Sequence, residues 1–383
     1  MKKSILRTIL TVMLIVIFST SSVLAASLPS SPSKSWIYNA NGTTKTNVRK
    51  VAGSSPTGYN VLQGSCNDGN GNFYFAFMSK SDEQIKIAKM QLVDGKFVLV
   101  QKTGVLDIYH GNDMTYIPNA GGIQGNDKIL ITNNPNIYTI TVFDVATMQV
   151  EGSFTYKYYK ETNWDDCKFY VEGKLIEPKD EVAKSYVYDP SADAEEEEDD
   201  EYCLEDYTCE HHGFSNIAYN PENGKLVSGI TGCHDLIIYD LKYSNGQFSV
   251  KPEAYIIQER IESTFQGMDC DSNYIYMVWS PGNGIITNRI YVYDWKGKKK
   301  KRYIIDETYE MESLSHVGST FYAGYHHSFI YKWTEKVKKK YKWKKVWNED
   351  HTEKIWKYKT KTVKVKHSQR RRNAYIKQIN MAS

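Results

Sequence analysis

Polar side chains recur along this chain at the starts of strand-like runs, each beside a small or polar residue. The recurring set is Gln63, His110, Asn112, Asp113, Asp165, His212, Gln266, Asp269 and Glu312. Gathered at one point, such carboxylate, amide and imidazole groups would bind a sugar, a phosphate-bearing polymer or a hard cation. No cofactor is expected, with calcium as the alternative. The alternative is that they hydrogen-bond neighbouring elements and satisfy buried polar groups.

Catalysis has weaker support in the sequence. No Gly-x-Ser-x-Gly motif is present, and the adjacent carboxylates of Asp165 and Asp166 would point to opposite faces of a strand. The pairs His211-His212 and His326-His327 lack the short ligand spacing of zinc motifs, so no transition-metal site is expected. We therefore expect a binding protein, with a glycan-active enzyme (a polysaccharide lyase or hydrolase) as the alternative.

The C-terminal residues 334–383 form a strongly basic segment. They hold 17 Lys+Arg and four Asp+Glu, a net charge of +13, whereas the rest of the chain carries −10. In KVKKKYKWKKVW and KIWKYKTKTVKVK, cations alternate with aromatic or β-branched residues, which predicts a β-hairpin with one cationic and one aromatic face. The residues after it, from Gln369, are expected to be disordered.

This hairpin is suited to an anionic polymer or surface, because charge supplies long-range attraction and aromatic rings supply contact. The residues expected to make that contact are Lys338, Lys340, Lys342, Trp343, Lys344, Trp347, Trp356, Lys357 and Lys359. The alternative is a hairpin that folds against the negative charge of the rest of the chain.

The elements that would position the polar residues are repeated units. Similar segments begin at Gln63, His110, His212 and Gln266, with a degenerate copy around Glu312 and a further one near Asn163. Several units contain a strand ending in Tyr/Phe-Asp, as in TITVFD, DLIIYD and RIYVYD. Small antiparallel sheets repeating every 40–55 residues or so indicate an all-β fold, a β-propeller. We expect six blades over residues 26–333, with five or seven as alternatives, and the basic hairpin extension over residues 334–383.

The segments HGND, STFQGMDCDSNYIYMVWS, YVYDWKG and EMESLSHVGSTFYAGYHH carry a resemblance to known proteins. Over Gln63 to Tyr331 the pattern resembles a loose group of secreted propellers that includes helveticin-J-type bacteriocins and the receptor-binding propellers of phage tails, with their teichoic-acid-operon relatives. The resemblance implies a binding propeller that acts at bacterial surfaces, usually on wall polymers. The sequence departs from the group in its acidic insertion, in its basic tail, and at Ser313.

Residues 1–25 have the pattern of a cleaved secretory signal peptide. Lys2, Lys3 and Arg7 precede an apolar run that is too short to span a bilayer, and Val23-Leu24-Ala25 suits cleavage. We therefore expect a secreted protein, in part associated with the cell wall. Residues 189–212 form an acidic insertion, which is expected to be a mobile loop because its like charges repel.

The six cysteines permit disulfides in an exported protein. Cys203 and Cys209 are close in sequence and are expected to pair. Cys66, Cys167 and Cys270 occupy similar places in different units, so they are expected to be too far apart to pair and to act as small buried hydrophobes.

Together these features predict a monomer that binds an extracellular glycan or anionic wall polymer and makes peripheral contact with the envelope. Specific binding of nucleic acid is not expected. A bacteriocin-like antagonistic protein is a further alternative.

Overall fold

The computed structural model describes residues 37–38, 61–79, 83–133, 139–155, 166–176, 214–230, 235–258, 264–280, 288–305, 307, 309–379 and 381. Nearly all regular structure in these ranges is β-strand, with one short 3₁₀ turn, η1 (Ala120–Gly122). The prediction of an all-β chain built from small antiparallel sheets is confirmed. Among these residues, no helix has the length and apolar character needed to cross a membrane.

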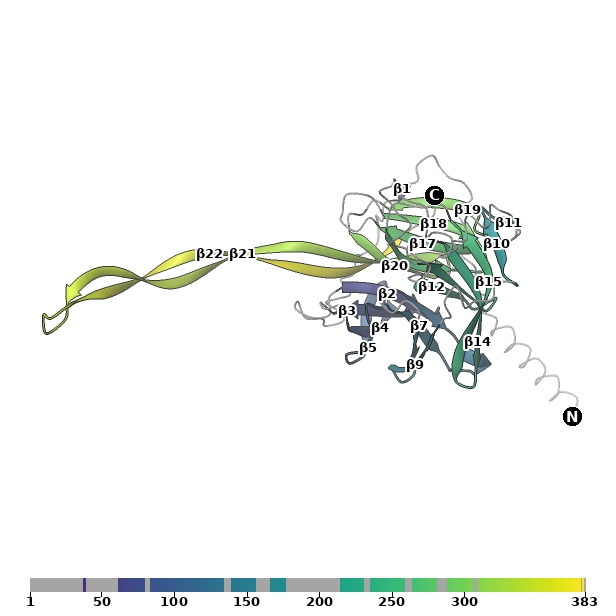
Figure 1. Cartoon of the computed structure of the whole chain (residues 1–383), viewed down its shortest axis with the longest axis horizontal. Helices are drawn as coiled ribbons and strands as arrows, with labels where there is room; N and C mark the ends of the chain where they lie inside the picture. Colours follow the sequence, from purple (N-terminus) through teal and green to yellow (C-terminus); the bar gives the residue numbers. More distant parts are fainter. Residues whose placement is uncertain are drawn as a thin grey trace, which may run out of the picture. The chain divides into compact units, whose positions relative to one another are not determined.

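Three of the sheets contain a run of four strands in which each strand pairs antiparallel with the next along the chain (Figure 1). The first holds β2 (Val61–Asn67), β3 (Asn72–Met78), β4 (Ile85–Val93) and β5 (Lys96–Lys102). The other two hold β12 (Phe214–Asn220), β13 (Lys225–Ile230), β14 (Leu236–Ser244) and β15 (Gln247–Ile257), and β16 (Thr264–Cys270), β17 (Tyr274–Ser280), β18 (Asn288–Asp294) and β19 (Lys299–Ile305).

A fourth sheet has the same order, with β6 (Met114–Ile117), β7 (Lys128–Thr132), β8 (Thr139–Asp144) and β9 (Gln149–Thr155). A fifth holds β20 (Glu310–Val317), β21 (Thr320–Trp347) and β22 (Lys354–Ile379). The turns inside the sheets use residues with positive φ. Examples are Asp94-Gly95 and Asn245-Gly246, which are typical of tight hairpins.

The unit expected near Asn163 does not form a sheet of its own in the part of the chain that is described. β10 (Lys168–Val171) pairs parallel with β15, and β11 (Lys174–Ile176) pairs with β10, so both extend the β12–β15 sheet. The described residues therefore form five sheets, whereas six blades were expected, with five or seven as alternatives. The sequence does not specify which strand a short strand pairs with, and β10 extends an existing sheet because it pairs with β15.

The two ends of the chain join different sheets. β1 (Ile37–Tyr38) pairs parallel with β19, and β22 completes the last sheet. The expected disorder from Gln369 is wrong, because Ala374, Ile376 and Ile379 are buried. These apolar side chains alternate along the strand, and burying them on one face stabilises it.

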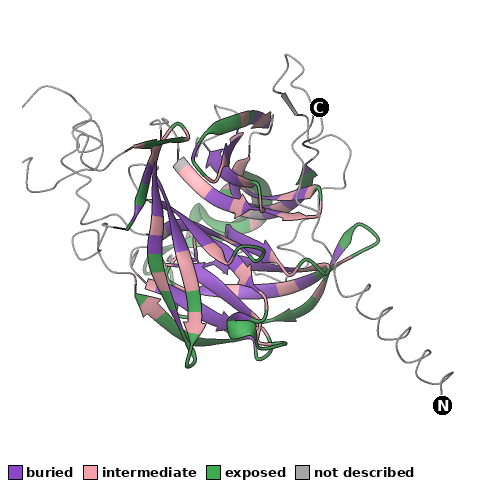
Figure 2. Ribbon diagram, turned by 90° about the vertical axis from the view of Figure 1, so that its right-hand side faces the viewer, coloured by how far each residue is buried: buried purple, intermediate pink, exposed green. Residues whose placement is uncertain are grey.

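The hydrophobic core consists of layers between neighbouring sheets, and Figure 2 shows buried residues running along most of the strands. One cluster joins the β2–β5 and β6–β9 sheets, and a second joins β6–β9 to β12–β15. Others join β12–β15 to β16–β19, and β16–β19 to β20–β22. A further cluster brings Leu62, Phe73 and Phe75 of the first sheet together with Ala374 and Ile376 of the last.

The central strands are buried on both faces, which explains their continuous apolar sequences. In β17, Tyr276 and Val278 pack in one cluster, while Ile275, Met277 and Trp279 pack in the next. Side chains of a strand alternate between faces, so YIYMVW serves two interfaces at once.

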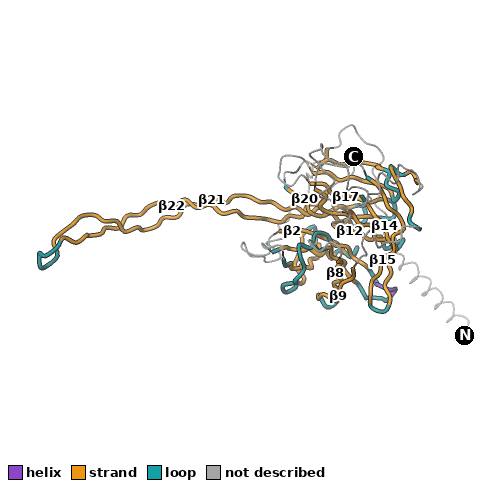
Figure 3. Tube along the Cα trace, viewed as in Figure 1, coloured by secondary structure: helices purple, strands orange, loops and turns teal. Residues whose placement is uncertain are grey.

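The chain divides into a compact body, residues 1–326 and 374–383, and a second unit, His327–Asn373. This unit consists of the long parts of β21 and β22, which run side by side as a twisted ribbon (Figures 1 and 3). A turn joins them, in which Asn348 N–H donates to Glu353 O over 2.9 Å. The second unit thus begins at His327 and ends at Asn373.

The burial of the C-terminal strand makes a stability prediction. Ile376 is 2% exposed, whereas Ile355 on the ribbon is 44% exposed. Ile376→Ala should lower the free energy of unfolding by about 2–5 kcal/mol, because it removes buried methylenes and leaves a cavity. The matched change Ile355→Ala should alter it by less than about 0.5 kcal/mol. Equal effects of the two substitutions in denaturant titrations would contradict the placement of β22 in the core.

Candidate functional site

The first strands of the five sheets, β2, β6, β12, β16 and β20, are neighbours and carry most of the polar residues singled out in the sequence. β2 contacts β6 and β20, β12 contacts β6 and β16, and β16 contacts β20. We call these five strands the inner strands. In β2, β12, β16 and β20 the pairing with the next strand shifts at a β-bulge, which coincides with the repeated sequence signature.

Asp113 connects three of the inner strands. Its side chain is fully buried, and its carboxylate accepts N–H groups from Met114 at 2.9 Å, Ile217 at 3.2 Å and Met268 at 3.0 Å. Burial raises the pKa of this carboxyl, and the three backbone donors act against that rise. The carboxylate is thus occupied by backbone groups of β6, β12 and β16, so Asp113 has a fastening role and is not open to a ligand.

Two glycines of the signature are required by the close approach of the inner strands. A Cβ atom on Gly64 would lie 2.8 Å from backbone atoms of Asp113, and one on Gly267 would lie 2.8 Å from Cα of Ser313. Gly64 N–H donates to Gly111 O over 3.3 Å. The glycine after Gln63 and Gln266 is therefore a packing requirement between neighbouring sheets.

β16 and β20 are linked by the side chains of Asp269 and His316. His316 Nδ1 lies 2.6 Å from Asp269 Oδ2. Burial lowers the pKa of His316, but the adjacent Asp269 carboxylate outweighs this effect and holds the pKa above its ordinary value. Asp269, which was predicted to bind a ligand, is thereby paired with another inner strand.

A second polar cluster on the same two strands includes two of the predicted residues. Gln266 Nε2 donates to Glu310 Oε1 over 2.9 Å. His326 Nδ1 lies 3.5 Å from Glu310 Oε2 and 3.6 Å from Glu312 Oε1. The structure thus brings Gln266 and Glu312 together with Glu310 and His326, which had not been selected as ligand-binding residues.

Sequence signals for these two missed residues exist in retrospect. Glu310 lies two residues before Glu312, which is the spacing that places strand side chains on one face. His326 could not be chosen over His327 without the strand register.

Three further predicted residues of this set lie in the described part of the chain. Gln63 is buried, Asn112 is partly buried, and His110 has a positive φ of 58°. Asp165 and His212 lie outside the described residues, as do Cys203 and Cys209.

The described cysteines Cys66, Cys167 and Cys270 are free and buried. Burial raises the pKa of Cys66 and Cys270, and that of Cys167 to about 12, so the thiols are held in their neutral form. They thus act as small buried hydrophobes, as expected.

The nine ribbon residues predicted to contact an anionic surface are all exposed. Trp343, Trp347 and Trp356 are 44%, 51% and 39% exposed, which is high for indole side chains. Exposed aromatic side chains on a two-stranded ribbon supply little stabilisation to the ribbon itself and are available for contact.

Lysine ammonium groups of the ribbon lie over its aromatic rings. Lys359 Nζ is 3.6 Å from the centroid of Trp343, and Lys344 Nζ is 4.5 Å from the same ring. Lys342 and Lys345 lie 5.3 and 5.4 Å from Trp356. The expected division into a cationic and an aromatic face is therefore incomplete, because two-stranded ribbons twist strongly and bring lysines over neighbouring rings.

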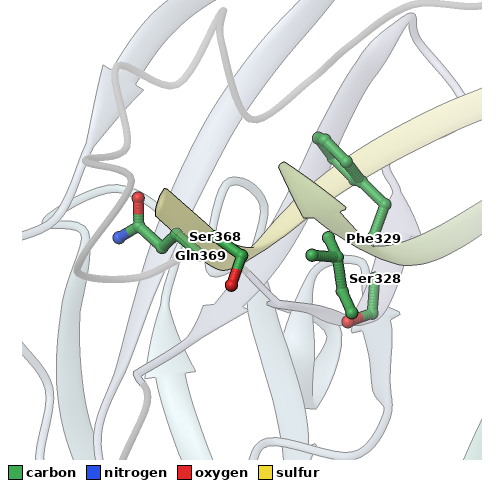
Figure 4. Close-up of a pocket in the computed structure, with 5 residues that line it drawn as sticks. Ser328, Phe329, Ser368 and Gln369 are labelled. Carbon is green, nitrogen blue, oxygen red and sulfur yellow. The ribbon is translucent and has the colours of Figure 1, made fainter. Parts of the chain in front are cut away.

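A small hollow is present on the ribbon between β21 and β22. It is lined by Ser328, Phe329 and Ile330 of β21 and Ser368 and Gln369 of β22, with a volume of about 350 Å³ (Figure 4). Its lining contains no charged residue, so it does not resemble a site for an anion.

No family model matches this sequence, and no curated protein matches it. Solved structures with some likeness include the calcium-binding protein regucalcin from Agrobacterium tumefaciens, at 13% identity and a TM-score of 0.37 over 75% of this chain and 86% of that one. The tail fiber of Staphylococcus aureus phage P68 has 14% identity and a TM-score of 0.38 over 70% of this chain. This chain covers only 47% of that tail fiber.

A GH43 β-1,3-galactosidase solved with galactodeoxynojirimycin has 11% identity and a TM-score of 0.41 over 69% of this chain and 85% of that enzyme. Structural similarity at such low identity and TM-score assigns no function to this chain.

The His316–Asp269 pair predicts a pH dependence of stability. The pKa of His316 is higher in the folded protein than in the unfolded chain, so its contribution is complete below about pH 6.5 and is lost as pH rises through the folded pKa. Chemical denaturation from pH 6 to pH 9 should show this decline in the wild type but not in His316→Gln. The control His351→Gln, at an exposed turn position, should retain it. The same decline in His316→Gln would contradict the prediction.

Proposed function

We propose that the protein is an exported binding protein in which a β-propeller body holds a basic aromatic ribbon that binds anionic wall glycopolymers. The export step is supported by the pattern of residues 1–25. The propeller is proposed to be closed and five-bladed. Two observations support closure: each inner strand contacts two others in a cycle, and a core cluster joins the first sheet to the last.

The observation that carries the binding proposal is the composition of the exposed ribbon surface. Residues 327–373 contain 17 Lys+Arg and four Asp+Glu, and their lysines are interleaved with exposed tryptophans. An isolated two-stranded ribbon buries little apolar surface, so selection for its own stability does not account for exposed indole rings. A polyanion would neutralise the lysines, while its apolar parts would cover the rings.

The cation–π contacts make the ribbon a prearranged surface. Lys359 and Lys344 both lie against Trp343, and Lys354 Nζ is 5.0 Å from the ring of Trp347. Such contacts are worth about 0.5–1 kcal/mol each at exposed sites and limit the freedom of the lysine side chains. An arrangement that is already ordered loses less entropy when a polymer binds.

An anionic wall polymer, such as a polyol phosphate, fits this surface better than a neutral glycan. The repeated negative charges of such a polymer match lysines spaced along strands of 28 and 26 residues. The hypothesis of a glycan-active enzyme stays a prediction, as does that of an antagonistic protein. Among the predicted carboxylates, Asp113 is occupied by backbone donors and Asp269 by His316.

The lysines predict a salt-dependent affinity. Purified cell walls that retain their teichoic acid should bind the protein, and affinity should fall as ionic strength rises, because exposed charges are screened. The triple substitution of Lys342, Lys344 and Lys359 by Gln should weaken binding at low salt by about tenfold or more and flatten its salt dependence. The matched control replaces three exposed lysines of the body, Lys96, Lys174 and Lys296.

Equal retention of the triple variant and the wild type would refute the role of the ribbon. Walls stripped of teichoic acid should bind weakly, and equal binding to stripped walls would refute the anionic ligand.

The aromatic rings make a separate prediction. Trp343→Ala should weaken binding to the same walls by about five- to tenfold, because a contact ring and the platform for Lys359 and Lys344 are lost. Its salt dependence should stay that of the wild type, since no charge has been removed. Trp343→Phe should recover part of the affinity. A wild-type affinity for Trp343→Ala in the same retention assay would show that the rings make no contact.

A further inference from the structure

Three side chains on β20 and β21 bring metal-ligand atoms close together. Glu310 and His326 are direct cross-strand partners, so they share one face of the sheet. Glu312 joins them because β20 is bulged between Met311 and Ser313, and a bulge changes the direction of a side chain. The ligand atoms of the three residues all lie within 4.8 Å of one another.

The separations within this cluster suit a bridging cation better than direct hydrogen bonds. His326 Nδ1 is 3.5 Å from Glu310 Oε2 and 3.6 Å from Glu312 Oε1. Hydrogen bonds between imidazole nitrogen and carboxylate are shorter, about 2.8 Å. Ligand atoms held tetrahedrally by zinc at about 2.0–2.1 Å lie about 3.3–3.4 Å from one another. The two distances from His326 Nδ1 are closer to this ligand–ligand separation than to a hydrogen-bond length.

The burial of the cluster also points to a ligand. The His326 side chain is 10% exposed and that of Glu312 is 5% exposed. Among the described residues, the buried Nε2 of His326 has no hydrogen-bond partner, so this nitrogen is also open to water or a ligand. With a neutral imidazole the three side chains carry a charge of −2, and two carboxylates this close favour a compensating cation.

We infer that Glu310, Glu312 and His326 form a binding site for a divalent cation of the zinc class. The imidazole ligand favours zinc over calcium and magnesium, which prefer oxygen ligands only. Gln266 supports the site from β16, because its Nε2 donates to Glu310 Oε1 and leaves Oε2 directed at His326. Three protein ligands leave a coordination position for water or for an anionic ligand.

This site lies in the body and is independent of the proposed binding by the ribbon. Its most direct test is calorimetric titration of the untagged, chelator-treated full chain with zinc, followed by cobalt with its visible absorption as a second signal. We expect about one high-affinity equivalent of zinc, with calcium binding at least tenfold more weakly. Thermal stability should rise with zinc concentration, because the ion binds only the folded protein.

The variants separate ligands from supporting residues. Glu312→Gln and His326→Ala should each weaken zinc binding by about 100-fold or more, and Gln266→Ala by about tenfold, as expected for a group that orients a ligand. Glu222→Gln, at an exposed turn of the body, is the matched control and should bind zinc as the wild type does. Glu312→Gln keeps the shape of the side chain, so it tests the site even if His326→Ala does not fold.

Two results would overturn the inference. The first is a folded wild type that binds no zinc at one equivalent, which would show that the three side chains contact one another without an ion. The second is zinc binding that persists unchanged in Glu312→Gln and in Gln266→Ala, which would place the ion elsewhere.

Discussion

The body depends on one constraint: the backbones of the five inner strands lie close together, so the polar groups buried between them need hydrogen-bond partners. The buried carboxylate of Asp113 satisfies three of these groups, because it accepts N–H groups of β6, β12 and β16. The same constraint explains Gly64 and Gly267, where a side chain would collide with the next strand. Ser65 and Ser313, whose hydroxyl groups are 2.8 Å apart, link β2 to β20 in the same way. The recurring signature is therefore first a packing device.

Packing of this kind leaves few polar residues for function, and the structure separates the two uses. The carboxylates of Asp113 and Asp269 contact groups on other inner strands, so they help to hold neighbouring sheets together. The cluster around His326 differs, since its groups are too far apart for short hydrogen bonds and too close together for separate charges. The ribbon differs again, because its lysines and rings are exposed. The proposed functions use these two places, which the packing of the inner strands does not require.

The ribbon and the body are stabilised by different means. Strands of the body are buried on both faces by clusters between sheets, so each apolar side chain adds to stability. The described part of the ribbon has contacts along and across its two strands, such as that of Trp333 with His367, whose ring centroids are 5.1 Å apart. Packing in a core therefore does not restrict which side chains the exposed positions of the ribbon can carry. The chain leaves the ribbon after Asn373 and is buried again in the body at Ala374.

By itself, the sequence determined what depends on local pattern. The alternation in IYMVW and YVYD, and turns such as Asn245-Gly246, specify strands and hairpins through neighbours in the chain. The alternating lysines and aromatic residues after Thr334 indicated the exposed ribbon for the same reason. Only the tertiary structure decided the partners of each element: β10 joined β15, and the supposedly disordered end of the chain entered the core at Ile376. It also decided that His326, and not His327, faces Glu310. These outcomes depend on contacts between residues far apart in the sequence, which no local periodicity encodes.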